Sequence, residues 1–143
     1  MLLHRGNNRE GTDMTEMAIQ KKRPKHLDLV VIRLPLPGFV SILHRLSGAG
    51  LFLMLPLLLW LFASSLGSPE GFATTKQVLA HPLVKLIMLG LLWAYLHHFC
   101  AGIRYLFLDL DMGVDLPAAR RSAWAVLAVS LPLTLILGWK LLW

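Results

Sequence analysis

Three long stretches of apolar residues most strongly constrain what this chain can fold into. Residues 46–63 contain no ionisable side chain, and residues 123–143 contain only Lys140. Residues 83–108 are also apolar, apart from one lysine, one arginine and a pair of adjacent histidines. An α-helix needs about 20 apolar residues to cross the hydrocarbon core of a bilayer, and each stretch is long enough. We therefore predict an all-α fold whose transmembrane helices lie at about residues 40–66, 83–108 and 123–143.

The composition and the cysteine count limit which chemistry the chain can perform alone. Of its 143 residues, 56% are hydrophobic and 15% are charged, whereas soluble domains average roughly 25% charged residues. The single Cys100 can neither form an intramolecular disulfide nor hold an iron–sulfur cluster. No glycine-rich phosphate loop follows a strand pattern, and the spans leave no room for a nucleotide-binding domain. Any flavin or nucleotide chemistry would therefore lie on another chain.

The net charge of +6 is concentrated before the first span and around the second connection. The connection between the second and third spans is flanked by Arg104, Arg120 and Arg121, whereas the first connection carries only Lys76. The positive-inside rule then predicts a cytoplasmic N-terminus. A basic tail beside an anionic membrane accounts for this charge, so we expect no nucleic-acid partner. We predict a disordered basic tail over residues 1–22 and one membrane domain over residues 23–143.

Proline and serine positions predict where the helices begin. The prolines of residues 24–37 favour extended structure or short turns, with the first helix beginning near Gly38–Val40. Pro56 should bend that helix without ending it. Ser68, followed by a proline, predicts the N-cap of a short surface helix that ends near Ala80. The sequence His-Pro at residues 81–82 starts the second span in the same way.

Polar side chains gather at the predicted cytoplasmic ends of the first two spans. An ionisable group costs about 2.5 to 3.5 kcal/mol at the centre of a membrane helix, so such residues usually face a bundle interior or a ligand. On the first span Ser41, His44 and Arg45 share one helical face. On the second span a single stripe is formed by His98, Gly102, Tyr105 and Asp109. Antiparallel neighbours would bring both groups to a similar depth, which predicts one site.

The residue types in this site suit a haem. An imidazole next to a small residue inside a membrane helix can ligate haem iron, and His98 lies one turn from Gly102. His44 and Arg45 could supply cations for the haem propionates. On spacing alone, a histidine that hydrogen-bonds between helices remains an alternative for His98. His97 is rotated by about 100° from its neighbour, so we expect it to pack against a helix or lipid instead.

The same residues also suit a quinone. A quinone carbonyl oxygen needs hydrogen-bond donors, and the hydroxyl of Ser41 and the guanidinium of Arg45 lie on one face. Two alternatives remain open at this point. Ser41 could be the N-cap of the first helix, and Arg45 could extend to lipid phosphates. Arg104 could pair with a propionate or mark the inner edge of the membrane.

Four segments together resemble a known family. They are SILHRLSG at residues 41–48, SSLGSPEGF at 64–72, HHFCAGIRYLFLD at 97–109, and the lead-in RPKHLDLVVIRLPLPG at 23–38. This combination resembles the cytochrome b556 membrane-anchor subunits of succinate dehydrogenase, respiratory complex II. The resemblance covers roughly residues 23–143 and includes the number and polarity of the spans.

The resemblance implies a role for each matching residue. His98 would be an axial ligand of the iron of haem b, with the other ligand supplied by a second anchor subunit. Ser41 and Arg45 would contribute to the ubiquinone site, with Asp109 near it. His44 and Arg45 would lie near the haem propionates. This chain departs from some relatives at Tyr105, where they carry a histidine, so a propionate-pairing role at that position does not carry over.

The resemblance also implies a function and partners. The chain would be a non-catalytic subunit of a succinate:ubiquinone oxidoreductase, in respiratory electron transport and the tricarboxylic acid cycle. Its partners would be the second anchor, an iron–sulfur subunit, a flavoprotein subunit and membrane lipid. We expect a multi-pass location in a bacterial inner membrane. The alternatives are a haem-free structural anchor and the anchor of a fumarate reductase.

Overall fold

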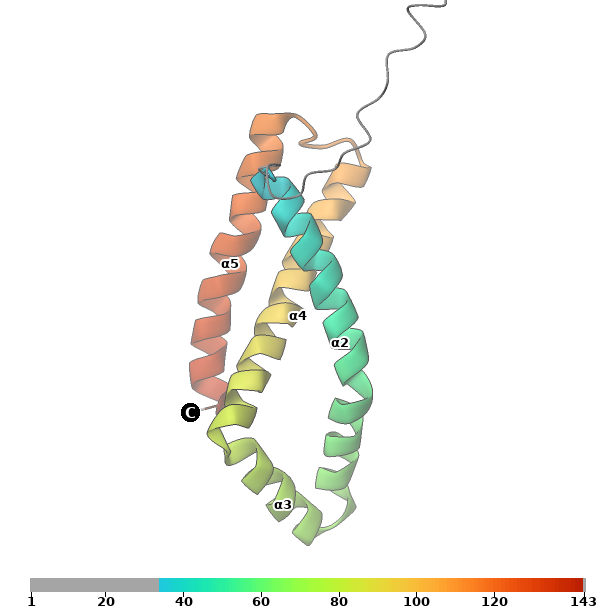
Figure 1. The fold of residues 1–143 in the computed structure, drawn as a ribbon, viewed down its shortest axis with the longest axis vertical. Helices are drawn as coiled ribbons and strands as arrows, with labels where there is room; N and C mark the ends of the chain where they lie inside the picture. Colours follow the sequence, from blue (N-terminus) through green and yellow to red (C-terminus); the bar gives the residue numbers. More distant parts are fainter. Residues whose placement is uncertain (1–33, 143) are drawn as a thin grey trace, which may run out of the picture. The chain divides into compact units, whose positions relative to one another are not determined.

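The computed structural model describes residues 34–142, and within that range the chain is helical except at short connections. The helices are α2 (Leu36–Gly67), α3 (Pro69–Ala80), α4 (Pro82–Asp109) and α5 (Leu116–Leu142), as Figure 1 shows. Three of them, α2, α4 and α5, are long and apolar enough to cross a membrane. The predicted all-α fold with three spans is therefore confirmed. The predicted N-terminal tail lies outside the described residues.

The short helix α3 and the start of α4 form as their sequences predict. The hydroxyl of Ser68 accepts a hydrogen bond of 3.0 Å from the backbone N–H of Gly71, and a proline follows at the first helical position. At the start of α4 the Nδ1 atom of His81 accepts a 3.3 Å bond from the N–H of Leu83. Both helices therefore begin at a side-chain cap followed by proline.

Two helices begin earlier than their predicted spans. Helix α2 starts at Leu36, with Pro37 in its first turn, where a helix needs no backbone N–H from the proline. The expectation of extended structure or turns is wrong at these two residues, while residues 24–33 lie outside the described part. Helix α5 starts at Leu116, so the exposed Arg120 and Arg121 belong to its first turns. Hydropathy located the apolar span, but the helix itself extends beyond it.

The chain reverses direction between α4 and α5 through a tight turn over residues 110–115. Asp111 and Gly113 adopt positive φ angles of 57° and 76°, a conformation that glycine adopts easily and aspartate tolerates. The backbone N–H of Met112 donates a 3.0 Å hydrogen bond to the carbonyl of Phe107, and this bond caps the end of α4. This turn brings the beginning of α5 back beside the end of α4.

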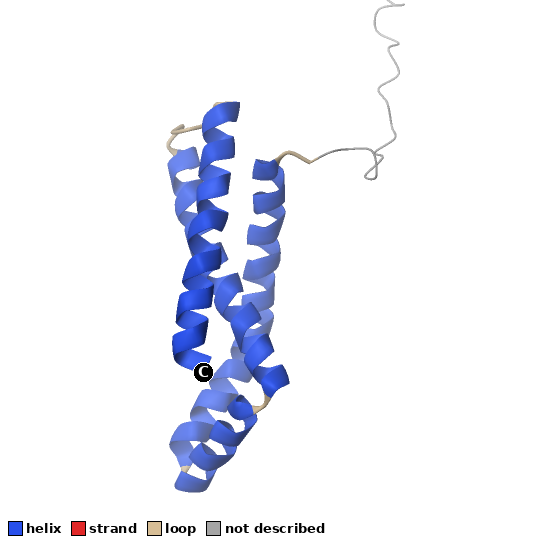
Figure 2. Ribbon diagram, turned by 90° about the vertical axis from the view of Figure 1, so that its left-hand side faces the viewer, coloured by secondary structure: helices blue, strands red, loops and turns tan. Residues whose placement is uncertain are grey.

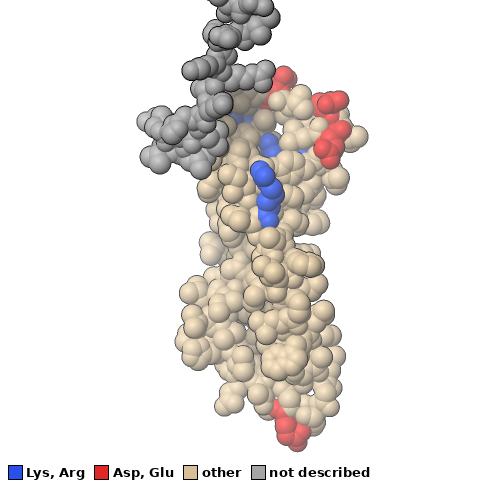
Figure 3. Space-filling model, turned by 45° about the vertical axis from the view of Figure 1, so that its right-hand side comes forward, with Lys and Arg blue, Asp and Glu red and all other residues tan. Residues whose placement is uncertain are grey.

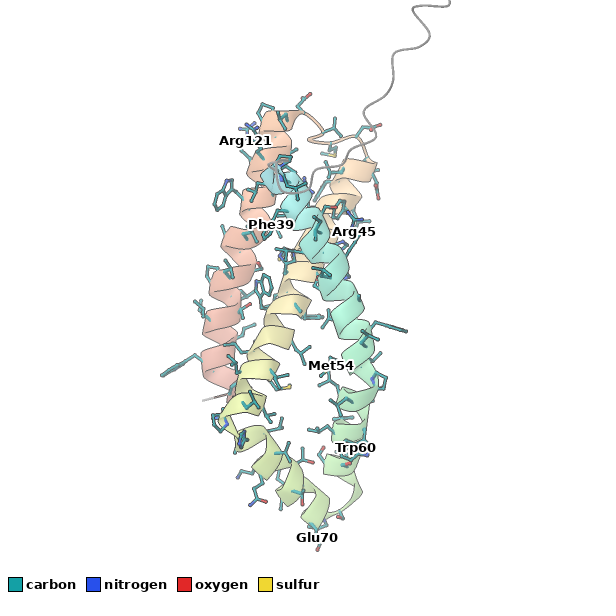
Figure 4. All side chains as sticks on the ribbon, viewed as in Figure 1. Phe39, Arg45, Met54, Trp60, Glu70 and Arg121 are labelled. Atoms are coloured by element: carbon teal, nitrogen blue, oxygen red, sulfur yellow. The ribbon has the colours of Figure 1, made fainter. Side chains whose placement is uncertain are left out.

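The three long helices lie side by side, and α4 runs antiparallel to both α2 and α5 (Figures 1 and 2). One end of the bundle, which we call the connection end, contains the turn of residues 110–115. The first turns of α2 and α5 and the last turns of α4 lie there as well. Helix α3 joins α2 to α4 at the opposite end. Figure 4 shows the resulting polarity, with Arg45 and Arg121 toward the connection end and Glu70 at the other.

A small apolar cluster holds the helices together near the connection end. Val40 of α2, Ala101 of α4, and Ala123 and Val126 of α5 are each at most 5% exposed. Short side chains let the helix backbones approach closely, which is how membrane helices associate without a hydrophobic driving force. Elsewhere many large apolar side chains point outward; Phe52, for example, is 76% exposed. Figure 3 shows the corresponding broad uncharged band, which lipid or another subunit would cover.

Candidate functional site

His44 of α2 and His98 of α4, two of the residues predicted to form one site, meet on the face between these two helices. The imidazole rings of His44 and His98 stack with their centroids 4.2 Å apart and their planes at 11°. The ring of Tyr105 also contacts His44, at a centroid distance of 5.0 Å. Gly102 lies opposite, because a Cβ atom there would be 3.8 Å from Nε2 of His44. The structure thus places the two histidines at the same depth, as the antiparallel arrangement required.

The hydrogen bonds of His98 fix which of its ring nitrogens carries a proton. Its Nδ1 atom lies 3.0 Å from the backbone carbonyl oxygen of His44 and 3.3 Å from the hydroxyl of Ser47. A carbonyl oxygen only accepts, so Nδ1 must donate, and in a neutral imidazole Nε2 then has a free lone pair. Within residues 34–142, Nε2 has no hydrogen-bond partner and is not one of the fully buried atoms that lack one. Part of the Nε2 surface is therefore exposed.

Ser47 and Gly48 of α2 contact the ring of His98. The sequence alone gave neither residue a role. The hydroxyl of Ser47, a residue only 8% exposed, donates a 2.9 Å bond to the carbonyl of His44 and also contacts His98. Gly48 lies directly against the His98 ring, and a Cβ atom there would come within 2.7 Å of Cε1. Both residues follow His44 by three or four positions, so helical spacing alone could have placed them on this face.

Ser41 and Arg45 form a pair on the same face of α2. The Nη2 atom of Arg45 donates a 3.3 Å hydrogen bond to the hydroxyl of Ser41, and its Nε atom lies 3.5 Å from the Ser41 carbonyl. Arg45 is exposed and Ser41 is half-buried. Because α2 begins at Leu36 with Pro35 as its N-cap, the alternative interpretation of Ser41 as the N-cap is wrong. The shared face predicted from their spacing is confirmed.

Asp109 is less closely connected to these residues. It is the last residue of α4, and its side chain is exposed. Within residues 34–142 it forms no side-chain hydrogen bond or ion pair, with Ser41 and Arg45 or with any other residue. Its position at the connection end agrees with the predicted stripe, but the structure does not join it to the pair on α2.

His97 and Arg104 take no part in the stack of His44 and His98. His97 is fully buried, its ring lies 5.3 Å from that of Trp93, and it lies near the backbone of Val40 on α2. We expected it to pack against a helix or lipid, and its complete burial agrees with packing against the helices. Arg104 turns to α5, where its Nε atom donates a 2.9 Å hydrogen bond to the hydroxyl of Ser122.

Comparison with known proteins identifies the family. Residues 19–137 match the family model of the succinate dehydrogenase/fumarate reductase transmembrane subunit. The chain belongs to this family. It is 41% identical to the succinate dehydrogenase cytochrome b556 subunit of Coxiella burnetii over 110 residues. These residues are 76% of this chain and 88% of that protein. The protein of the same name from Paracoccus denitrificans is 34% identical over 80% of this chain and 88% of its own length.

A more distant relative extends the match along the chain. The succinate dehydrogenase cytochrome b556 subunit of Rickettsia felis is 30% identical over 123 residues, which are 86% of this chain and 96% of that protein. Family membership and the three apolar helices together establish a multi-pass membrane protein. The resemblance first seen in the motifs of α2 and α4 is confirmed.

Proposed function

We propose that this chain is a membrane-anchor subunit of a succinate:ubiquinone oxidoreductase, and that it binds haem b through His98. Its relatives are named as cytochrome b556 subunits of succinate dehydrogenase. The observation that carries the proposal is the hydrogen bond from Nδ1 of His98 to the carbonyl of His44. Histidines that ligate metals almost always donate their other ring N–H in this way, which holds the ring in place and leaves Nε2 for the metal.

The residues around His98 fit a haem. Nε2 of His98 would ligate the haem iron, and the second anchor subunit would supply another ligand. When bound, haem b supplies a centre that can accept and release one electron. His44 stacks on His98 and Arg45 is the next residue of α2, so both could face the anionic propionates. This chain's own task is to hold the imidazole, set its tautomer and neutralise the propionates.

Ser41 and Arg45 would form this chain's part of the quinone site. Both side chains carry hydrogen-bond donors, and they already lie within hydrogen-bond distance of each other at the connection end of α2. A quinone carbonyl oxygen placed between them would receive bonds that strengthen as negative charge develops during reduction. Asp109, exposed at the same end, would lie near this site. Succinate oxidation itself would occur on the flavoprotein subunit, with electrons passing through the iron–sulfur subunit.

The orientation follows from the charges. With basic residues flanking the connection end, this end and the N-terminus would lie in the cytoplasm of a bacterium, and the soluble subunits would bind there. A fumarate reductase anchor is the second candidate, because the matched family includes both enzymes. The quinone type and the enzymatic direction measured on the purified complex separate the two.

The haem assignment is tested by replacing each of the adjacent histidines. His98→Leu should abolish or severely perturb the b-type haem, because leucine offers no lone pair to iron. His97→Leu is the matched control, because it replaces the adjacent, fully buried imidazole, to which the proposal gives no role in haem binding, and it should leave the haem in place. The measurement is the reduced-minus-oxidised visible spectrum per assembled complex. An unchanged spectrum in His98→Leu would refute the assignment.

The quinone assignment is tested with two electron acceptors. Ser41→Ala and Arg45→Leu should each lower quinone reduction while succinate oxidation by a soluble acceptor persists. Losing a hydrogen bond to a charged partner costs about 1.5 to 3 kcal/mol, or roughly ten- to a hundredfold in rate if fully expressed in the transition state. Ser65→Ala, on the same helix but away from the connection end, is the control. Equal loss with both acceptors would mean that the pair serves assembly rather than quinone reduction.

A further inference from the structure

A groove between α4 and α5 lies apart from the histidine site. Its volume is about 450 Å³, within the range of roughly 300 to 1,000 Å³ that is usual for ligand pockets. It is open to the outside of the chain, and Met112 and Gly113 of the turn border it at the connection end. Its lining is otherwise almost wholly apolar and includes Cys100, Ile103, Phe107, Ala125, Val126 and Val129.

One cation lines this apolar groove. Arg104 is only 7% exposed, and its hydrogen bonds go to neutral oxygens, those of Ser122 and, at 3.4 Å, the carbonyl of Ala119. Within residues 34–142 no carboxylate lies within ion-pair distance of it. A guanidinium has five N–H donors, so further donors remain for another acceptor. A buried charge without a counter-charge is costly, and an anion from outside these residues would offset that cost.

The position of Arg104 suits the headgroup of a lipid. It lies five residues before the end of α4, or about 7.5 Å along the helix axis. If α4 crosses the membrane, this is the depth at which phosphates lie and to which arginines extend. The apolar lining at Val129 lies deeper along α5, so the groove offers a cation at one end and hydrocarbon contacts beyond it.

The charges around the groove indicate which type of lipid headgroup would fit there. Residues 109–115, the end of α4 and the turn that follows it, carry three exposed carboxylates, on Asp109, Asp111 and Asp115. The first turns of α5 carry two exposed cations, Arg120 and Arg121. The carboxylates beyond Arg104 would attract the ammonium group of a headgroup whose phosphate pairs with Arg104. This order of charges matches a zwitterionic phospholipid.

We propose that the α4–α5 groove binds a zwitterionic phospholipid. One acyl chain fills the groove, the phosphate pairs with Arg104, and the ammonium group faces the acidic turn of residues 109–115. The inference rests on the groove and its charges, and it does not depend on the haem or the quinone. It assigns to Arg104 a role in lipid binding, separate from the residues that face α2.

The test measures lipid retained by the purified assembly that contains this chain. The complex is stripped with detergent, reconstituted with equal amounts of phosphatidylethanolamine and phosphatidylglycerol, and analysed by native mass spectrometry. Arg104→Gln removes the cation, and Ala125→Phe fills the groove while leaving Arg104 and Ser122 intact. The matched controls are Arg120→Gln and Ala128→Phe, which alter exposed residues of α5 outside the groove lining.

The proposal expects selective loss of phosphatidylethanolamine. Arg104→Gln should retain at least about tenfold less phosphatidylethanolamine per complex, because losing a charge-assisted hydrogen bond usually has an effect of this size. Ala125→Phe should also lose this lipid, and both controls should match the unmodified chain. Equal retention in all variants, or preferential binding of phosphatidylglycerol, would overturn the proposal. So would the loss of another subunit from Ala125→Phe with lipid retention unchanged, because the groove would then be a subunit contact.

Discussion

Helix α4 contacts its two neighbours in different ways. Toward α2 it presents an imidazole, and the contact is made by the ring stack and by hydrogen bonds from His98 to the backbone and to a serine. Toward α5 small and apolar residues pack, with Gly138 against Leu89, and Arg104 donates hydrogen bonds to residues of α5. One face of the helix therefore orients a functional group, and the other holds the bundle together.

Two glycines illustrate the difference. Gly48 of α2 leaves space for the ring of His98, whereas Gly138 of α5 leaves space for an aliphatic side chain. Both permit close approach of helices, which is the usual role of small residues in membrane bundles. Their neighbours decide what is lost when that space is filled. Substitutions at these two positions should therefore separate cofactor binding from packing.

The largest effect is expected for Gly48→Leu. A Cβ atom at this position would lie 2.7 Å from Cε1 of His98, so the ring must move and its bond to the His44 carbonyl must break. Overpacking of this kind typically costs about 1 to 3 kcal/mol, and here the displaced group is the proposed haem ligand. We expect near-complete loss of haem per assembled complex, measured from the reduced-minus-oxidised spectrum.

A second glycine on α2 provides the control for this experiment. A Cβ atom at Gly50 would have nothing within 4 Å among the atoms of the described residues, so Gly50→Leu should keep its haem. If Gly48→Leu binds haem normally, the ring of His98 does not depend on the space at Gly48. If both variants lose haem, the effect comes from α2 as a whole rather than from this contact.

An intermediate effect is expected for Gly138→Leu on the other face of α4. The new side chain would collide with Cδ1 of Leu89, so the side chain of Leu89 must move or α4 and α5 must separate locally. We expect a loss of about 1 to 3 kcal/mol in packing, seen as a lower unfolding temperature of the purified complex. The haem spectrum of the assembled fraction should be unchanged, because His98 contacts α2.

Gly90→Leu is the matched control for Gly138→Leu, because a Cβ atom at Gly90 meets no atom of the described residues within 4 Å. It should unfold at the same temperature as the unmodified chain. Haem loss in Gly138→Leu without loss of stability would contradict the division of α4 into an orienting face and a packing face.

The sequence was sufficient to predict the helices because hydropathy and capping signals act locally. The three spans, the α3 cap at Ser68 and the start of α4 at His81 all follow from residues within a turn or two of each other. The start of α2 was missed because a proline can begin a helix as well as interrupt one. At residues 35–37 only the structure distinguishes these two possibilities.

The site was only partly predictable, because spacing gives the face of a helix but not its partner. Spacing correctly placed Ser41 beside Arg45 and separated His97 from His98. It could not show that the carbonyl of His44 would accept a hydrogen bond from His98, since backbone acceptors leave no mark in a sequence. Nor could it show that Arg104 faces α5, because this depends on how α4 is rotated in the bundle.

The smallest effect is expected for Ser47→Ala. This substitution removes one hydroxyl between α2 and α4 and adds no bulk. The hydroxyl bonds to the carbonyl of His44 and contacts Nδ1 of His98, so its removal loosens the ring while its main hydrogen bond remains. Losing one such neutral bond costs about 0.5 to 1.5 kcal/mol. Haem should still bind, with retention during detergent washing reduced by up to roughly tenfold.

Ser65 provides a close control, because its hydroxyl also bonds to the carbonyl three residues before it, that of Phe62 at 2.7 Å, but has no histidine beside it. Ser65→Ala should therefore retain haem as the unmodified chain does. Equal weakening in both variants would mean that serine stabilises α2 in general. Weaker haem retention in Ser47→Ala alone would indicate that this hydroxyl acts through His98. If that loss is smaller than in Gly48→Leu, packing against Gly48 holds the His98 ring in place more than the hydroxyl does.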